Sequence, residues 1–134
     1  TVSTYEMQFG DNDTLSALVA SMVGADLLIL LSDIDGLYTD DPHKNPEARL
    51  LKVVDAIDEN IYGMAKESTG SNVGTGGMAT AKIATLSGTD MIIANGGDVR
   101  ILQDIFENDY VGTLFTANEN ANFNLANYIM ETIG

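Results

Sequence analysis

The sequence predicts an α/β domain, a three-layer αβα sandwich with a mainly parallel sheet between its helices. Segments with helical and with strand-like apolar spacing alternate along the 134 residues. The apolar run "ADLLILLSD" at residues 25–33 is too short for a buried helix and is typical of a parallel strand covered on both faces. Small polar residues gather where the predicted strands end, which is where such sheets bind ligands. A chain of this length forms one domain with a modest core.

The first half of the chain predicts a helix, a central strand and an excursion. Residues 13–24 carry apolar side chains at helical spacing after "FGDND", which predicts an amphipathic helix with its N-cap in that turn. The strand at 25–33 follows. The segment "GLYTDDPHKNPEARLLKV" holds both prolines of the chain, so we expect it to form an excursion or hairpin over a sheet edge, outside the core.

The second half repeats the alternation. We expect a helix over residues 58–67, and the Ser, Gly and Thr residues of 68–77 predict a loop. "DMIIANGG" at 90–97 predicts a short strand that ends in glycines. Apolar residues at helical spacing predict a helix near residues 99–106, and "VGTLFTA" at 111–117 predicts the last strand. No internal repeat or linker divides this order of elements.

Charge and composition exclude several function classes. Six Lys and Arg against twenty Asp and Glu give a net charge of −14, and such a field repels nucleic acid and anionic lipid. A bound phosphate must therefore be held by backbone N–H groups, a metal ion or a few local lysines. The chain has no cysteine, which excludes disulfides and thiol catalysis and fits a reducing cytoplasm. We find no apolar run near the roughly 20 residues of a membrane span and no signal peptide, so we expect a soluble protein without a membrane partner.

Four polar clusters lie at the predicted turns: "FGDNDT", "LSDIDG", "GTGGMAT" and "ANGGD". Taken singly, each has a structural explanation. Asx residues ahead of a helix are usually caps, and aspartates after a strand are usually turn formers. Glycine runs serve many tight turns. His43 lies between Pro42 and Lys44 in a charged loop, which favours a solvated surface histidine.

The order of the clusters carries more information than any one of them. "FGDNDTLSALVA", "LLILLSDIDGLYTDDP", "GTGGMAT" and "GTLF" follow one another as in the glutamate 5-kinase branch of the amino acid kinase family, which the chain closely resembles from about Thr1 to Phe115. The resemblance implies a mostly parallel sheet between helices, and transfer of the γ-phosphoryl group of ATP to the side-chain carboxylate of L-glutamate with Mg²⁺. The product would be γ-glutamyl phosphate, formed in the first step of proline biosynthesis.

The resemblance also implies roles for individual residues. Asn12, with Asp11 beside it, matches a glutamate-binding position, and Asp13 matches the aspartate that orients the family's catalytic lysines. Ser32 and Asp33 match nucleotide contacts. The nucleotide loop of the family, whose backbone N–H groups and helix N-terminus face a phosphate, is matched by Thr75, Gly76, Gly77, Met78, Ala79 and Thr80. No residue is matched to a metal ligand.

Two features of the family pattern are missing from the sequence. The family has one lysine near the N-terminus and one directly after "GGMAT", whereas here Thr80 is followed by Ala81 and Lys82. Lys82 matches a position about one turn further along, so the catalytic role is not assigned to it. We therefore expect a missing segment between Thr80 and Ala81, seen as a break in the chain. We also expect residues 1–134 to be the C-terminal, nucleotide-binding part of one amino acid kinase domain that is incomplete at its N-terminus.

Several expectations follow from this interpretation. The tail "NFNLANYIMETIG" resembles the end of the short bacterial forms of the branch. The predicted partners are L-glutamate and ATP in a cytoplasmic homo-oligomer. The incomplete sheet should expose an apolar face where N-terminal strands belong. Two alternatives stay open: another amino acid or carbamate kinase of the same fold, and a noncatalytic nucleotide-binding fragment.

Overall fold

The structure, a computed structural model, describes residues 11–69 and 72–118 of the chain. Of the side chains within these ranges, those of residues 11–14, 66–69 and 72–76 are not described. The expected similarity of the C-terminal tail to short family members lies outside the described residues. The elements, in chain order, are α1 (Asp11–Met22), β1 (Leu27–Ser32), β2 (Val53–Val54), α2 (Glu59–Thr69), α3 (Asn72–Leu86), β3 (Asp90–Asn95), α4 (Arg100–Phe106) and β4 (Gly112–Phe115).

The described strands form one mixed sheet in the order β1-β3-β4-β2. β1 pairs with β3 in parallel and β2 with β4 in parallel, whereas β3 and β4 are antiparallel. Two of the three pairings are therefore parallel, as predicted. The central position predicted for the strand at 25–33 is wrong, because β1 lies at an edge of the sheet among the described residues.

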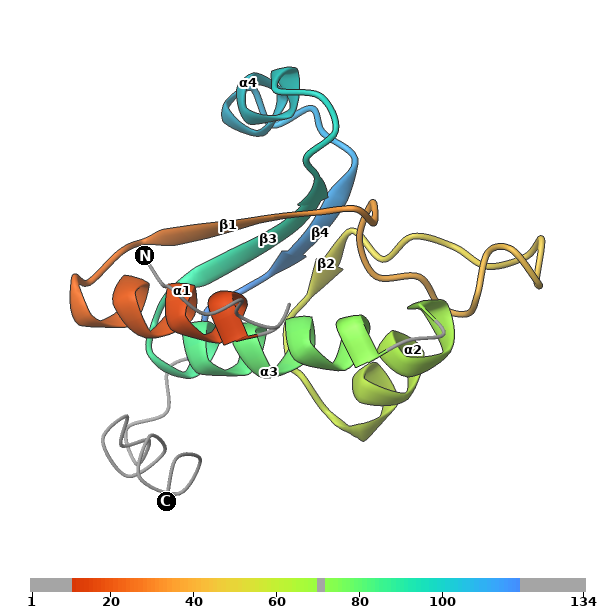
Figure 1. The fold of residues 1–134 in the computed structure, drawn as a ribbon, viewed down its shortest axis with the longest axis horizontal. Coiled ribbons are helices and arrows are strands. Elements are labelled where there is room, and N and C mark those ends of the chain that lie inside the picture. The colour runs from red at the N-terminus through yellow and green to blue at the C-terminus, as the bar shows by residue number, and fades with distance from the viewer. Residues whose placement is uncertain (1–10, 70–71, 119–134) are drawn as a thin grey trace, which may run out of the picture.

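Helices cover the two faces of the sheet unequally. α1 and α3 lie side by side on one face, with α2 packed against α3, and α4 lies on the other side (Figure 1). Alternate residues of each strand serve the two faces. In β3, Met91 and Ile93 join the large core under α1 and α3, while Ile92 and Ala94 pack with Ile105 of α4. The three-layer α/β architecture is thus confirmed, with a thin second helical layer.

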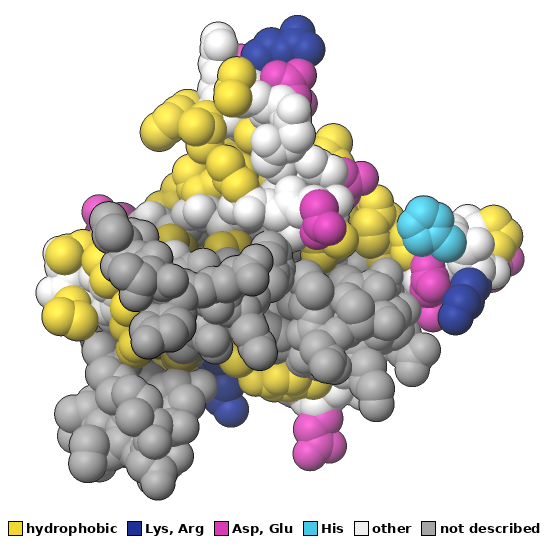
Figure 2. Space-filling model, in the orientation of Figure 1, with side chains coloured by type: hydrophobic (Ala, Val, Ile, Leu, Met, Phe, Trp, Pro, Cys, Tyr) yellow, Lys and Arg dark blue, Asp and Glu magenta, His cyan; other side chains and the backbone are white. Residues whose placement is uncertain are grey.

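The face that carries α4 leaves apolar side chains exposed, and whether absent N-terminal strands belong there stays a prediction. Leu27 and Leu31 of β1 are 39% and 44% exposed, and Val53 of β2 is also exposed. Phe106 of α4 is 81% exposed. Figure 2 shows hydrophobic side chains at the surface around α4, at the top of the view. Within the described part of the chain, the second face is therefore only partly covered.

The glycine-rich segment differs from its prediction. α2 continues to Thr69 and α3 begins at Asn72, so the loop predicted over 68–77 is wrong for most of its length. α3 then runs through Thr80 and Ala81, both fully buried, as one helix. The predicted break between these two residues is absent from α3. Whether the family carries an extra segment at this point stays a prediction.

The excursion follows its prediction more closely. Residues 33–52 leave the sheet after β1 and return to β2 through an antiparallel bridge between Tyr38 and Leu50. Leu37 is the exception, because it is buried and belongs to the large core. Among the described residues, no helix is long and apolar enough to cross a membrane.

Candidate functional site

Three of the polar clusters found in the sequence lie toward one end of the sheet. α1 leads through a short turn into β1, and α3 leads through a short turn into β3, so each helix runs antiparallel to the strand that follows it (Figure 1). The N-terminal ends of α1 and α3 therefore lie toward the carboxyl ends of β1 and β3. This end collects residues 11–13, residues 32–33 and the start of the glycine-rich helix α3. In open α/β sheets, the carboxyl ends of parallel strands are the usual ligand site.

A hollow of about 390 Å³ opens beyond the carboxyl ends of β1 and β3. That volume is in the range of small-molecule sites. The hollow is bordered by the excursion that follows β1 and by the last residue of β3. Its lining residues are Asp33, Ile34, Asp35, Gly36, Tyr38, Pro42, His43 and Asn95.

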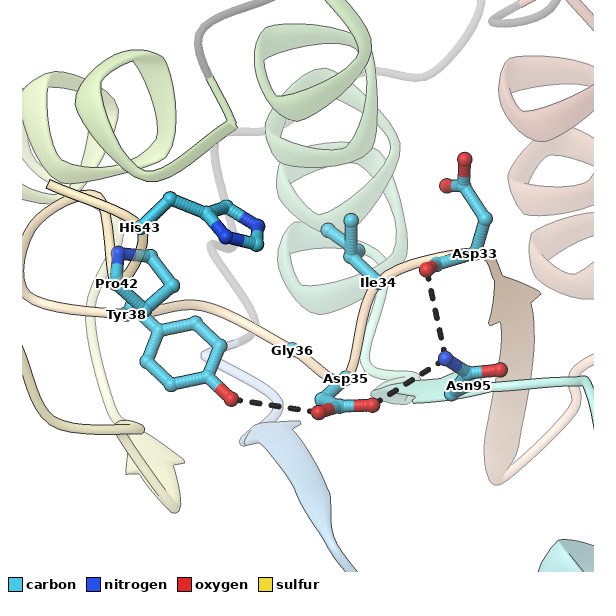
Figure 3. Close-up of a pocket in the computed structure, with 8 residues that line it drawn as sticks. All are labelled: Asp33, Ile34, Asp35, Gly36, Tyr38, Pro42, His43 and Asn95. Carbon is cyan, nitrogen blue, oxygen red and sulfur yellow. Dashed lines mark hydrogen bonds between the residues drawn. The ribbon is translucent and has the colours of Figure 1, made fainter.

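Asn95 links the two strand ends across this hollow. Its amide Nδ2 donates to the backbone carbonyl of Asp33 at 3.4 Å and to Oδ1 of Asp35 at 3.3 Å. The hydroxyl of Tyr38 donates to the other carboxylate oxygen of Asp35 at 3.4 Å. Figure 3 shows that the Asp33 carboxylate points away from this network, while the Asp35 carboxylate lies within it. Asp33 accepts a hydrogen bond on one carboxylate oxygen, from the Ser32 hydroxyl, whereas both oxygens of Asp35 accept one.

The charges around the hollow are negative. Of the described residues that line it, two are aspartates and none is Lys or Arg. Burial raises the pKa of Tyr38, and the charge of Asp35 and the hydrogen bond to it act in the same direction, so Tyr38 stays neutral near pH 7. Arg100, in the helix that follows β3, is engaged by Asp98 at 2.8 Å. A phosphate at this end thus needs backbone N–H groups or a metal ion to offset its charge.

α3 presents its N-terminal turn at this end. The first N–H groups of an α-helix have no partner within the helix, which makes its N-terminus a site for anions. α3 is described from Asn72, so only Thr75 of the six predicted loop residues lies among its first four described residues. From Gly76 onward, helix geometry directs each N–H to the carbonyl four residues earlier. Gly77 is buried, and a Cβ placed on it would lie 3.6 Å from Ile93 of the sheet.

Met78 and Thr80 also lie in the interior of the molecule. Both are buried, and Ala79 between them is partly buried. In the described part of the chain, these three residues therefore belong to the packing between α3 and its neighbours. Their predicted role as nucleotide contacts, like that of Gly76 and Gly77, stays a prediction.

The predicted substrate cluster forms the first turn of α1. Asp11, Asn12 and Asp13 lie inside the helix, where we had expected the turn that precedes it. Their side chains are not among those described, so the predicted roles in glutamate binding and lysine orientation remain predictions. Ser32 ends β1, and its hydroxyl accepts from the backbone N–H of Ile34 and lies 3.3 Å from the Asp33 carboxylate.

Lys82 lies away from this end of the sheet. It is ten residues after Asn72 in α3, which corresponds to about 15 Å along the helix axis. There it lines a smaller pocket of about 100 Å³ with Asp55, Thr85 and Thr116. This position agrees with the decision not to assign Lys82 the catalytic role.

Sequence reasoning missed the part that Asn95 and Tyr38 play. The sequence analysis assigns no function to Tyr38 or to any residue of the polar cluster "ANGGD". The position of Asn95 at the last residue of a strand parallel to β1 was the available signal. His43 was predicted to be a surface residue, and it is exposed at the rim of the hollow. Among the described residues, no group of three or more His, Asp or Glu is arranged to hold a metal ion.

Known proteins resemble the chain in sequence. A glutamate 5-kinase of Clostridium tetani is 51% identical over 84% of the chain, and one of Idiomarina loihiensis is 43% identical over 98% of it. The chain spans only 43% and 36% of the lengths of these two relatives.

The fold has solved counterparts as well. The crystal structure of a uridylate kinase from Archaeoglobus fulgidus superposes with a TM-score of 0.60 at 24% identity, covering 78% of this chain and 46% of that one. At this identity the likeness concerns the fold. The model of the amino acid kinase family matches residues 2–101, about three quarters of the sequence, and the chain therefore belongs to the amino acid kinase family.

Proposed function

We propose that the complete polypeptide transfers the γ-phosphoryl group of ATP to the side-chain carboxylate of L-glutamate, giving γ-glutamyl phosphate for proline biosynthesis. In this proposal, residues 1–134 are the C-terminal, nucleotide-binding part of the kinase domain. The observation that carries it is the meeting of residues 11–13, residues 32–33 and the start of α3 at one end of the sheet. Relatives that bear the name glutamate 5-kinase, at 43–51% identity, support the choice of acceptor.

Phosphoryl transfer to a carboxylate requires correct placement of the two substrates and positive charge near the phosphates, more than it requires a general base. The acceptor is already a carboxylate, so no proton has to be removed before it attacks phosphorus. The difficulty is to bring a carboxylate and a polyphosphate together in line. In the proposed arrangement, Asp11 and Asn12 bind glutamate at the start of α1, and Asp13 orients cationic groups supplied by the rest of the polypeptide.

In this proposal the nucleotide binds at the other two clusters, residues 32–33 and the start of α3. Ser32 and Asp33 contact ATP at the carboxyl end of β1. The first-turn amides of α3, with Thr75 among them, face the phosphates. The remaining motif residues keep their predicted role as nucleotide contacts in this proposal: Gly76, Gly77, Met78, Ala79 and Thr80.

Mg²⁺ fits the donor set of this end. The ion binds phosphate oxygens and waters together with only one or two carboxylates, so an all-protein cage is not required. One oxygen of the exposed Asp33 carboxylate accepts from the Ser32 hydroxyl, whereas both oxygens of Asp35 already accept hydrogen bonds. When bound, Mg²⁺ would offset the charge of the phosphates at an end where the described lining residues include no Lys or Arg.

The test is an acceptor panel with the complete polypeptide and Mg-ATP. Acyl phosphate is trapped with hydroxylamine after incubation with glutamate, acetylglutamate, aspartate or carbamate. We expect product with glutamate alone. Product with another acceptor and none with glutamate would assign the protein to a different kinase of the same fold.

A noncatalytic nucleotide-binding fragment is the second candidate, and the shortage of cations around the hollow favours it for residues 1–134 alone. Calorimetry of this chain with Mg-ATP, beside a turnover assay, separates the two functions. Binding without turnover in the complete polypeptide would support the second candidate. We also propose that the protein acts as a homo-oligomer in the cytoplasm, which size-exclusion chromatography with light scattering and cell fractionation test directly.

A further inference from the structure

Thr113 is a fully buried polar residue in β4, in the "GTLF" motif to which the resemblance assigned no role. Its hydroxyl accepts a hydrogen bond from the backbone N–H of Leu37 at 2.9 Å and donates one to the backbone carbonyl of Leu51 at 2.6 Å. Leu37 lies at the start of the excursion and Leu51 at its end. One hydroxyl therefore ties both ends of the excursion to the sheet.

The backbone of residues 33–38, called the β1 loop below, passes directly over this hydroxyl. A Cβ added at Gly36 would lie 2.6 Å from Oγ1 of Thr113 and 3.2 Å from its backbone nitrogen. Such distances leave no room for a side chain. The glycine and the threonine together fix how closely the β1 loop approaches β4.

The β1 loop is also the main wall of the candidate nucleotide hollow. It contributes Asp33, Asp35 and Tyr38 to the lining. The exposed bonds through Asn95, at 3.3 and 3.4 Å, are long and hold the loop only at its beginning. The two bonds of Thr113 are shorter, and the residue is shielded from water, so they constrain the loop more strongly.

We propose that Thr113 is a positioning residue for the nucleotide site: it holds the β1 loop so that Asp33 meets the nucleotide. The inference rests on the proposed nucleotide role of Ser32 and Asp33. Thr113 itself is fully buried and touches no ligand. Its effect passes through the backbone of Leu37 and Gly36.

The experiment compares three variants of the complete polypeptide. Thr113→Val keeps the shape of the side chain and removes its hydroxyl. Thr113→Ser keeps the hydroxyl and removes the methyl group. Thr89→Val is the matched control, because Thr89 is also buried and its hydroxyl donates to a backbone carbonyl, that of Ala25, at 2.8 Å. Thr89 lies at the N-terminal end of β3, away from the β1 loop. For each variant, the KM for ATP, the KM for glutamate, kcat and the melting temperature are measured.

We expect Thr113→Val to raise the KM for ATP at least tenfold while the KM for glutamate changes less than twofold. Thr113→Ser should return the KM for ATP to within threefold of its original value. Thr89→Val should lower the melting temperature to a similar degree without changing either KM. Equal effects of Thr113→Val and Thr89→Val on the KM for ATP, or failure of Thr113→Ser to restore it, would overturn the proposal.

Amide hydrogen exchange separates this proposal from the one on which it rests. Exchange at Leu37 and through residues 33–38 should rise in Thr113→Val and stay low in Thr89→Val. If Asp33→Ala leaves the KM for ATP unchanged, the nucleotide assignment of Asp33 fails, and the proposal for Thr113 fails with it as a statement about function. Faster exchange in Thr113→Val would then still identify the hydroxyl as the tether of the loop, whereas unchanged exchange would overturn the tether as well.

Discussion

The two ends of the sheet differ in what they offer a ligand. Beyond β1 and β3 lies the hollow of about 390 Å³ with two carboxylates and a linking Asn95. Beyond β2 and β4 lies the pocket of about 100 Å³ with Lys82, Asp55 and Thr116. The end with the larger hollow carries the sequence motifs of the family, and the end with the lysine does not.

The difference arises because two of the four described strands, β2 and β4, run opposite to β1 and β3. β4 is antiparallel to β3 and parallel to β2, so the carboxyl ends of β2 and β4 point opposite to those of β1 and β3. The N-terminal ends of helices α1 and α3 lie toward the carboxyl ends of β1 and β3. The first turns of these two helices, whose N–H groups have no partner within the helix, therefore lie at that end, while Lys82 lies toward the other.

The sharpest test of the comparison is at the start of α1. In the complete polypeptide, Asp13→Ala should lower kcat by about 10²–10³-fold, because it misplaces the cations that stabilise the transition state. Asn12→Ala should mainly raise the KM for glutamate. Steady-state kinetics and thermal melts on both variants provide the measurement. Parallel losses of stability and activity in both would mean that these residues only cap the helix.

The second test sets a carboxylate of one end against a carboxylate of the other. Asp33→Ala should weaken ATP binding at least tenfold, since it removes the carboxylate of the hollow that is proposed to contact the nucleotide. Asp55→Ala should leave ATP binding within twofold, although it removes a carboxylate that accepts from the hydroxyl of Thr116 at 3.1 Å. Calorimetric titration with Mg-ATP measures both. Similar losses in the two variants would remove the distinction between the ends.

A third test concerns the interior of α3. Gly77→Ala adds a Cβ that meets Ile93 at an ordinary contact distance of 3.6 Å, and it removes a flexible residue from a helix. We expect a gain of about 0.5–1 kcal/mol in the free energy of unfolding and ATP affinity within twofold. Denaturant melts and calorimetry check these values. A large loss of ATP affinity would instead favour a phosphate contact at Gly77, as in the loop predicted from the sequence.

The smallest effect is expected at Lys82. Because its side chain lines the pocket at the far end, Lys82→Met should change kcat and both KM values less than twofold. The same assay that detects the Asp13→Ala effect is sensitive enough for this comparison. A fall in kcat of tenfold or more would return the catalytic lysine to this position.

The sequence predicted the elements of this fold better than their arrangement. Strong local patterns located β1, β3 and β4 within about two residues, because a short apolar run bounded by turns has few other structures. The edge position of β1 was not predictable in the same way. Which strand lies at an edge depends on pairing between distant segments, and the run "ADLLILLSD" reads the same in either position.

The glycine-rich helix shows where local reasoning fails. Residues 72–77 contain three glycines, a composition that disfavours helix. Their helical structure continues into a segment in which Met78, Ala81 and Ala84 pack in the core, and tertiary packing of that face outweighs local propensity. Prediction of the candidate site from local sequence was limited in the same way. Asp33 was found from its motif, whereas Asn95 gains its role only from the parallel register that places it beside Ser32.

The reversed strand β4 has a consequence for how this molecule can diversify. Chain that follows β4 leaves the sheet at the end away from the hollow, with Asn118 hydrogen-bonded to the carbonyl of Thr85 near the end of α3. Among the described residues, the linings of the hollow and of the smaller pocket have no residue in common, so the effects on stability of substitutions in the two linings should add. Natural selection can therefore remodel one end of the sheet while the chemistry at the other is preserved.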